Sequence, residues 1–394
     1  MSSESSRVIL PEPPDELKQL SEELRDRIRC SIRAQGPMRF SRYMEMALYE
    51  PGLGYYSAGL QKFGAGGDFI TAPELGNVFA RCLATQIEQI AHELDDYCIV
   101  EVGAGSGRLA AELLAALAGT APPHRYLILE PSADLRAVQR ETLQQEQPEW
   151  IDRVQWLDEP PTAKWQGVLI ANEVLDALPV ERFCIASGVV QQIEVSLNGE
   201  NLCWSHGIAS EALQSAVTRA LGTRLKELTE GYTSEISLMM TPWLRGLCAG
   251  LDRGCALFID YGYPRHEFYS AERNMGTLIC HYRHRAHNEP FIFPGLQDIS
   301  AFVDFTALAE AAGACGLECA GYTSQAMFLL SCGRDSIAAG LEGLAGRERL
   351  ERASEIRQLT LPGAMGEKFQ VMALSRGIDV DLRGFELLDL RHRL

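Results

Sequence analysis

The run IVEVGAGSGRLA has the residue types and spacing of a ligand-binding turn, carried by Glu101, Gly103, Gly105 and Gly107. It follows an apolar stretch and leads into an Ala/Leu-rich one. Glycines let the backbone adopt unusual dihedral angles and approach a ligand closely. A dinucleotide-binding turn has the pattern GxGxxG and places the pyrophosphate at a helix N-terminus. The pattern here is E-x-G-x-G-x-G, with an acid two residues before the first glycine.

Glu130 follows the apolar run YLIL and falls 23 residues after Gly107. A carboxylate at the end of a second strand can accept hydrogen bonds from both ribose hydroxyls of a nucleoside. A helix N-terminal acid that complements the helix dipole is the alternative explanation. Further along, Trp156 and Leu157 fall where an adenine would be sandwiched, although core packing explains Trp156 equally well.

The two acids together favour a nucleoside ligand and disfavour a pyrophosphate. Glu101 would repel a pyrophosphate, yet it suits the cationic methionyl group of S-adenosylmethionine. An ordinary tight βα turn is the alternative for the glycines, and their pattern argues against NAD. The sequence therefore predicts S-adenosylmethionine as cofactor and S-adenosylhomocysteine as product, held by Glu101, Gly103, Ala104, Gly105, Gly107, Glu130, Trp156, Leu157 and Asn172.

A second group of acids lies in ANEVLDALPVERF, directly after the apolar run GVLIA. Polar residues at the carboxyl edge of a parallel sheet face the ligand crevice. Glu173 and Asp176 are three residues apart, so one helical turn would place both carboxylates on one face. Together with Asn172 they are the candidate catalytic residues, because paired carboxylates can grip a guanidinium and free one nitrogen for methyl attack. A helix cap with surface acids is the alternative.

The segment GGDFITAPE is too apolar for a linker and too rich in glycine for a strand. We therefore expect a lid, since closing loops of this kind complete many active sites on substrate binding. Its candidate contacts are Asp68, Phe69, Thr71, Pro73 and Glu74.

Three histidines in HYRHRAH, at positions 281, 284 and 287, invite comparison with zinc sites. On one helix this spacing would spread the rings over more than one face, and no Cys or Asp pair completes a ligand set. We therefore expect no bound metal and take His281 as a contact to substrate or lid.

Short apolar runs alternate with helical patterns around these motifs, which indicates βαβ units and a parallel sheet. Right-handed crossovers would stack these units in one doubly wound sheet, so the sequence predicts an α/β fold with a Rossmann-like core. The expected strands are 97–102, 126–129, 154–157, 167–171, 256–259 and 369–374, and the expected helices include 109–117, 133–144 and 305–314.

The alternation breaks after Pro179, where β-type runs and an Asn198-Gly199 turn predict an inserted hairpin followed by a helical stretch. Prolines 11, 13 and 14 indicate a flexible N-terminus. The expected division is a flexible N-terminus at 1–20, a helical and lid region at 21–95, the first part of the core at 96–180, an insertion at 181–250, the second part of the core with helical additions at 251–380, and a C-terminal tail at 381–394.

The composition is that of a globular enzyme, with 394 residues, 46% of them hydrophobic and 23% charged. A net charge of -17 disfavours nucleic acid as a partner, since binding a phosphate backbone needs a basic surface. Eleven scattered cysteines without a CxxC pair suggest free thiols in a reducing compartment. No apolar run is long enough to span a bilayer, and no targeting segment is evident at the start, so we expect a cytoplasmic protein without membrane contacts.

Six motifs in this order resemble the class I methyltransferases of the MidA/NDUFAF7 type, which serve mitochondrial complex I assembly and protein arginine methylation. They are GDFITAPE, EVGAGSG, NEVLDALPVERF, IDYGYP, FVDF and MGEKF, and the resemblance runs from about Phe40 to Leu374. The family's glycine loop commonly has Pro and Arg where Ala104 and Ser106 stand here. All three glycines are present, although a contact made by that arginine would be absent.

The resemblance implies a mostly parallel seven-stranded class I methyltransferase sheet, an N-terminal helical region and an insertion before the fifth strand. It also implies an S-adenosylmethionine site and, from the eukaryotic relatives, arginine nitrogen in a protein as the methyl acceptor. A small-molecule methyltransferase and a non-catalytic assembly factor for a respiratory complex are the alternatives. The oligomeric state stays open, with a homodimer as one option.

Overall fold

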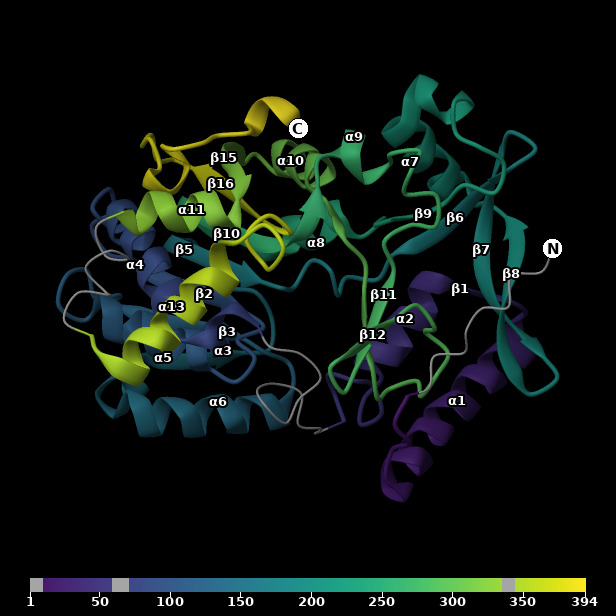
Figure 1. Ribbon diagram of the computed structural model, residues 1–394, viewed down its shortest axis with the longest axis horizontal. Coiled ribbons are helices and arrows are strands. Elements are labelled where there is room, and N and C mark those ends of the chain that lie inside the picture. The colour runs from purple at the N-terminus through teal and green to yellow at the C-terminus, as the bar shows by residue number, and fades with distance from the viewer. Residues whose placement is uncertain (1–9, 59–70, 335–343) are drawn as a thin grey trace. The chain divides into compact units, whose positions relative to one another are not determined.

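The computed structural model describes residues 10–58, 71–334 and 344–394, which form two compact units (Figure 1). The sheet unit comprises 71–176, 239–270 and 302–394, and the accessory unit comprises the described part of 1–70 with 177–238 and 271–301. These units depart from the expected division in four places. Residues 71–95 and 239–250 belong to the sheet unit, and residues 177–180 and 271–301 belong to the accessory unit.

The sheet unit is built on an eight-stranded sheet, seven of whose strands follow the order β4-β3-β2-β5-β10-β16-β15. The first five are parallel, and β16 runs antiparallel to both of its neighbours. A short eighth strand, β14 (Val303–Asp304), pairs with the end of β10. The mostly parallel Rossmann-like sheet is therefore confirmed. The strands are β2 (Cys98–Val102), β3 (Arg125–Leu129), β4 (Val154–Leu157), β5 (Trp165–Asn172), β10 (Leu251–Tyr263), β15 (Glu318–Ser324) and β16 (Phe369–Arg376).

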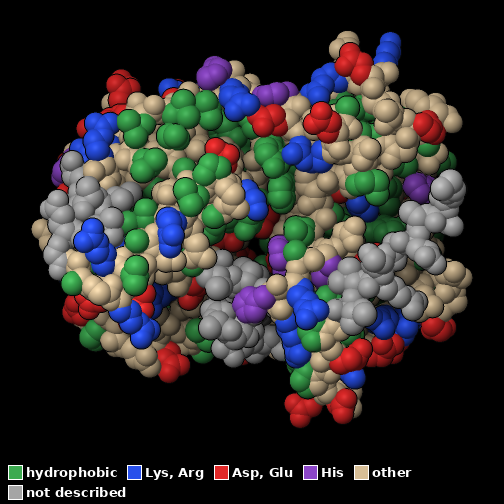
Figure 2. All heavy atoms as spheres, in the orientation of Figure 1, with side chains coloured by type: hydrophobic (Ala, Val, Ile, Leu, Met, Phe, Trp, Pro, Cys, Tyr) green, Lys and Arg blue, Asp and Glu red, His purple; other side chains and the backbone are tan. Residues whose placement is uncertain are grey.

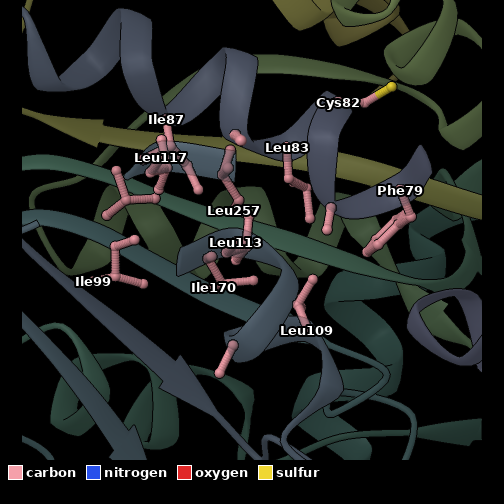
Figure 3. Packing of buried hydrophobic residues seen from close by; sticks show 14 of the residues in the cluster. Phe79, Cys82, Leu83, Ile87, Ile99, Leu109, Leu113, Leu117, Ile170 and Leu257 are labelled. Carbon is pink, nitrogen blue, oxygen red and sulfur yellow. The ribbon is translucent and has the colours of Figure 1, made fainter. Parts of the chain in front are cut away.

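One face of this sheet packs against α4 (Val78–Ala91) and α5 (Arg108–Leu117) (Figure 3). Alternate strand residues point to opposite faces, so one set of side chains from the central strands meets the apolar sides of these helices. Full burial of each large apolar side chain stabilises the fold by roughly 1.5–3 kcal/mol. The buried contacts include Phe79, Leu83 and Ile87 from α4, Leu109, Leu113 and Leu117 from α5, and Ile99, Ile170 and Leu257 from the strands.

The other face is covered by α10 (Phe305–Ala314), which contacts β10 and packs against α8 (Met240–Leu247). Trp243 of α8 meets Phe258 of β10 edge to face, with ring centroids 6.3 Å apart. This packing explains why residues 239–250 belong to the sheet unit. The remaining helical segments of the unit are α3 (Ala72–Leu75), α6 (Ala133–Glu146), η1 (Pro148–Arg153), α9 (Arg265–Phe268), α11 (Gln325–Cys332), α13 (Gly346–Thr360), η3 (Arg383–Phe385) and η4 (Arg391–Arg393).

The accessory unit contains a five-stranded antiparallel sheet and a three-stranded one. The predicted turn at Asn198-Gly199 is confirmed, because it joins β7 to β8 with Asn198 opposite Asn201. Its elements are α1 (Asp15–Gln35), β1 (Met38–Arg39), α2 (Phe40–Tyr49), β6 (Glu181–Ala186), β7 (Val189–Asn198), β8 (Asn201–Ile208), α7 (Glu211–Leu221), η2 (Gly222–Lys226), β9 (Thr233–Ile236), β11 (Ile279–Tyr282), β12 (Arg285–His287) and β13 (Asp298–Ser300).

Two details of the accessory unit differ from the expectation. Helix α1 begins at Asp15 and so takes in part of the expected flexible N-terminus, because a proline such as Pro14 fits the start of a helix. Residues 271–301 join this unit because Cys280 and Ile299 pack in the apolar cluster that α1 and α2 form with Ile28 and Phe40.

The histidine-rich segment is a β-hairpin, so the helical geometry considered for it is wrong. His281 lies in β11 and His287 in β12, and the two turn residues between these strands are Arg283 and His284. Both turn residues have left-handed backbone, with φ of 47° and 59°. That conformation usually selects Asn or Gly, which explains why the sequence gives no sign of the turn.

On the face drawn in Figure 2, Lys and Arg side chains are interspersed with Asp, Glu and apolar side chains. Among residues 10–58, 71–334 and 344–394, no helix combines the length and apolar content needed to cross a membrane.

Candidate active site

Three backbone hydrogen bonds join successive strand ends at the carboxyl edge of the large sheet. Gly103 N donates to Leu129 O at 3.0 Å, Glu130 N to Leu157 O at 3.2 Å, and Glu173 N to Ile259 O, in the carboxyl-terminal half of β10, at 2.9 Å. The ends of β4, β3, β2, β5 and β10 therefore form one continuous row. The predicted cofactor and acceptor residues of the sheet unit lie along this row, where parallel α/β sheets bind their ligands.

The glycine turn adopts the conformation that its sequence predicts. Gly103, Gly105 and Gly107 all have positive φ, at 64°, 54° and 83°. A side chain at such positions would be strained, which explains why all three are glycine. Gly107 N donates to Ala104 O at 2.8 Å and α5 begins at the next residue, so the turn leads directly into a helix N-terminus.

Glu101 is the last residue but one of β2 and is buried, with 3% of its surface exposed. Tyr126 Oη donates to its Oε2 at 2.7 Å. Burial, together with the nearby charge of Glu130, raises the pKa of Glu101 to about 7, and the tyrosine bond offsets part of this rise. A carboxyl poised between its charged and neutral forms suits the binding of a cationic ligand group.

We expect the affinity for S-adenosylhomocysteine to rise between pH 6 and pH 8. With a pKa of about 7, Glu101 is mostly protonated in the free protein at pH 6, whereas the ligand's ammonium favours the ionised carboxylate. Binding below pH 7 then releases a proton, and affinity should gain up to about tenfold per pH unit before levelling off. Calorimetry in buffers of different ionisation enthalpy measures both effects. Glu101→Gln should bind weakly and without this pH dependence, and an equal dependence in that variant contradicts the assignment.

Glu130 is buried directly after β3, with its carboxylate held by two donors. Ser132 N donates to Oε1 at 3.0 Å and Gln139 Nε2 to Oε2 at 3.1 Å. An ionised carboxylate offers about four lone-pair positions, and these two bonds orient it. The arrangement fits an acceptor for ribose hydroxyls.

Glu130→Ala should weaken binding of S-adenosylhomocysteine by roughly 1.5–3 kcal/mol, the range for hydrogen bonds to a charged group. Calorimetry at micromolar protein decides this. Asp134→Ala, an exposed acid four residues along the chain, is the matched control and should bind as the parent does. Equal affinity in Glu130→Ala and the parent would remove Glu130 from the cofactor site.

Trp156 and Leu157 end β4 beside Glu130, and both are partly buried. The indole Nε1 donates to Gln139 Oε1 at 3.0 Å, and the Arg140 guanidinium lies 4.4 Å from the ring centroid. Trp156 also packs against the main apolar cluster. Its contact with adenine stays a prediction, and its contact with Gln139 was not foreseen.

The expected helical turn after β5 is absent, so the pairing of Glu173 with Asp176 on a helix face is wrong. Residues 173–178 form a bend and a turn, and Glu173 has left-handed backbone with φ of 55°. Asn172 Nδ2 donates to Glu173 Oε1 at 3.2 Å, and Asp176 is 7% exposed. A strained acidic residue at a sheet edge is typical of functional sites.

Asp260 holds this turn in place, a role that the sequence analysis missed. Its Oδ2 accepts from the backbone N–H groups of Val174, Leu175 and Asp176 at 3.1, 2.8 and 3.2 Å, and Oδ1 accepts from Tyr261 N at 2.8 Å. The side chain is fully buried, three residues before the end of β10. Burial and the charge of Glu173 raise its pKa, while the backbone donors oppose this rise. The motif IDYGYP contained Asp260, but its partners lie more than 80 residues away along the chain.

The predicted lid residues divide into two groups. Asp68 and Phe69 lie outside the described residues, whereas Thr71 precedes α3 and Pro73 is buried within it. Glu74, on α3, accepts a short hydrogen bond from the hydroxyl of Ser106 in the glycine turn. Ser106, which stands where the family commonly has arginine, therefore still joins α3 to the turn.

His281 belongs to the accessory unit, where it lies directly opposite Asp298 on β13. Asp298 is buried, and it accepts from Tyr56 Oη at 2.9 Å and from Ser300 Oγ at 2.8 Å. The described residues contain no cluster of three His, Cys, Asp or Glu side chains arranged to hold a metal ion. The expected absence of a metal and the role of His281 stay predictions.

The chain is similar to proteins of known family. The family model of the S-adenosyl-L-methionine-dependent methyltransferases matches residues 78–323. A Burkholderia thailandensis protein crystallised with S-adenosyl-homocysteine is 41% identical, with a TM-score of 0.92 over 98% of this chain and 100% of that one.

More distant relatives have a named activity. The protein arginine methyltransferase NDUFAF7 of Danio rerio is 27% identical, over 87% of this chain and 84% of that protein. The Homo sapiens protein of the same name is 25% identical, over 87% and 81%. The family model covers more than half of this chain, and the Burkholderia protein matches almost all of it. The chain therefore belongs to the S-adenosylmethionine-dependent methyltransferases of the MidA/NDUFAF7 family.

Proposed function

We propose that this methyltransferase modifies an arginine nitrogen of a protein substrate. The observation that carries the proposal is the strained backbone of Glu173, which places an acid next to the glycine turn at the end of β5. A Cβ on Gly103 would lie 3.5 Å from Cγ2 of Val174, so the residues after Glu173 border the cofactor turn. The names of the NDUFAF7 relatives support the same acceptor.

The cofactor residues proposed for this chain lie on the row of strand ends. When bound, S-adenosylmethionine supplies a methyl group on a sulfonium, which is a strong electrophile. Glu101 would pair with the methionyl ammonium, Glu130 would accept from the ribose, and the turn from Gly103 to Gly107 would allow close approach. Asn172 Oδ1 is buried without a hydrogen-bond partner among the described residues, and such an acceptor fits an amino or guanidinium N–H.

An arginine acceptor requires activation, because the lone pairs of a guanidinium are delocalised at neutral pH. A carboxylate that binds one terminal nitrogen draws positive charge towards it and leaves the other terminal nitrogen richer in electrons. Glu173 would do this, with the turn that Asp260 anchors fixing its direction. The free nitrogen would form a bond to the methyl carbon as the bond from carbon to sulfur breaks, its electron pair would stay on the sulfur of S-adenosylhomocysteine, and the extra proton of the methylated guanidinium would pass to water. Positioning and electrostatics account for catalysis of this kind, without a covalent intermediate.

We further propose a cytoplasmic protein whose partner is its protein substrate, without nucleic acid. The negative net charge of -17 favours a basic substrate, because opposite charge accelerates encounter.

Label transfer tests the acceptor. The full chain is incubated with lysate and S-adenosylmethionine that carries a tritiated methyl group, and the labelled species are identified by mass spectrometry. We expect one or a few labelled proteins with methylarginine, and loss of label when that arginine is replaced by lysine. Label on a small molecule, or on a residue other than arginine, would contradict the proposal. In the same experiment, the Glu173→Gln variant should transfer much less label than the parent.

A further inference from the structure

Gln139 joins three parts of the cofactor site through one fully buried side chain. It lies in the middle of α6, beneath the glycine turn. Its Nε2 donates to Gly105 O and to Glu130 Oε2, both at 3.1 Å, and its Oε1 accepts from Trp156 Nε1 at 3.0 Å. One amide therefore contacts the ends of β2, β3 and β4.

The orientation of this amide is determined by its partners. An indole N–H can only donate, so the side of the amide that faces Trp156 must be the carbonyl oxygen. The NH₂ group then faces Gly105 O and the Glu130 carboxylate, which are both acceptors. Turning the amide over would exchange its oxygen and its NH₂ group, and all three hydrogen bonds would be lost.

Helix α6 also holds the glycine turn at a second point. Thr142 Oγ1, one helical turn after Gln139, donates to Ser106 O at 2.8 Å. A Cβ on Gly107 would lie 3.0 Å from Cα of Gln139, so the helix packs directly on the turn. The two side chains differ in their partners: Gln139 donates to Glu130 as well as to the glycine turn, whereas Thr142 donates to the turn at Ser106 O.

We propose that Gln139 is a positioning residue that fixes the Glu130 carboxylate relative to the glycine turn for recognition of the cofactor ribose. This rests on the cofactor role proposed above for Glu130. Without the Gln139 donor the Glu130 carboxylate would be held less firmly, because Ser132 N bonds only Oε1, and part of its rotational freedom would be lost only when the ribose binds. The donor removes that cost in advance. Loss of the Gln139 donor should therefore weaken the binding of ligands that carry both ribose hydroxyls more than the binding of ligands that lack one of them.

The test compares S-adenosylhomocysteine with its analogue lacking the ribose 3′-hydroxyl, by calorimetry on the full chain. Gln139→Met keeps the length of the side chain and removes both hydrogen-bonding groups. We expect it to bind S-adenosylhomocysteine about tenfold more weakly and the deoxy analogue less than about threefold more weakly, because hydrogen bonds to a charged group carry most of the loss. Thr142→Val is the matched control and should lower the affinity for both ligands by the same factor.

Two results would overturn the proposal. One is an equal loss of affinity for both ligands in Gln139→Met, which would mean that Gln139 supports the turn in general and not the ribose contact. The other is unchanged binding of S-adenosylhomocysteine. Should Gln139→Met fail to fold, Trp156→Phe removes the indole N–H that orients the amide. The smaller ring also changes apolar contacts, but both ligands share these, so the preference for the ribose hydroxyl must still fall or the proposal fails. Glu130→Ala separates the two assignments, because full affinity in that variant refutes the role of Glu130 itself. Binding does not involve the methyl acceptor, so the arginine proposal is tested independently.

Discussion

Glu173→Gln should lower methyl transfer by roughly 100-fold, as expected for the loss of a key electrostatic group in a preorganised site. Glutamine has nearly the same shape and can occupy the same left-handed backbone at φ of 55°, so the turn itself should persist. It lacks the negative charge that would draw positive charge from the guanidinium. Affinity for S-adenosylhomocysteine should stay within about threefold of the parent, because Glu173 is assigned to the acceptor.

The measurement pairs calorimetry of the cofactor product with label transfer to the identified substrate. Glu159→Gln, which neutralises an exposed acid shortly after β4, is the matched control and should transfer methyl at the parent rate. Asp176→Asn should lower transfer similarly if Asp176 faces the acceptor, and only weakly if it serves the turn. Should Glu173→Gln and Asp176→Asn both retain the parent rate, the acceptor groups would have to be sought among Thr71–Glu74 or around His281.

Asp260→Ala should lower the free energy of unfolding by about 3 kcal/mol or more. Four backbone N–H groups donate to this buried carboxylate, and a buried donor left without an acceptor costs about 1–3 kcal/mol. The loss should also release the turn that carries Glu173, so transfer falls as well. Chemical denaturation of parent and variant measures the stability difference.

Asp252→Ala provides the comparison at the opposite end of β10. Its carboxylate pairs with Lys164 at 2.8 Å, but both side chains are largely exposed, at 42% and 82%. Exposed pairs of this kind contribute about 0–1 kcal/mol, so this variant should be nearly as stable as the parent. If Asp260→Ala lowers the free energy of unfolding by less than about 1 kcal/mol, the prediction is wrong and water replaces the carboxylate at the backbone amides.

Much of the large sheet could be predicted from local sequence because six of its strands contain apolar runs between polar turns, whereas β14 and β15 (VD and ECAGYTS) do not and were not expected. β4 has the expected limits of 154–157 and α10 those of 305–314. β10 is longer than the expected 256–259, since its end pairs with β14 and β16, which lie far away in the chain. The glycine turn was predictable because positive φ restricts the choice of residue.

The parts of the site that could not be predicted depend on contacts between distant residues. Asp260 looks like any acid after a strand until its partners at 174–176 are known. Gln139 looks like a polar residue of an amphipathic helix, although its side chain is fully buried. The helical turn expected at Glu173 is absent because this residue has left-handed backbone, which no local pattern of ANEVLDALP indicates. Tertiary contacts determined the conformation at these positions.

The position of β16 in the large sheet has a consequence for how the protein folds as it is synthesised. β16 lies between β10 and β15 and is the pairing partner of both, yet it begins only at Phe369. More than nine-tenths of the chain must therefore leave the ribosome before β15 can join the sheet. Until then the edge of β10 is a long, apolar and unpaired strand, the kind of surface through which nascent chains aggregate. Production of this protein should therefore benefit from chaperones that cover exposed strand edges until β16 has been synthesised.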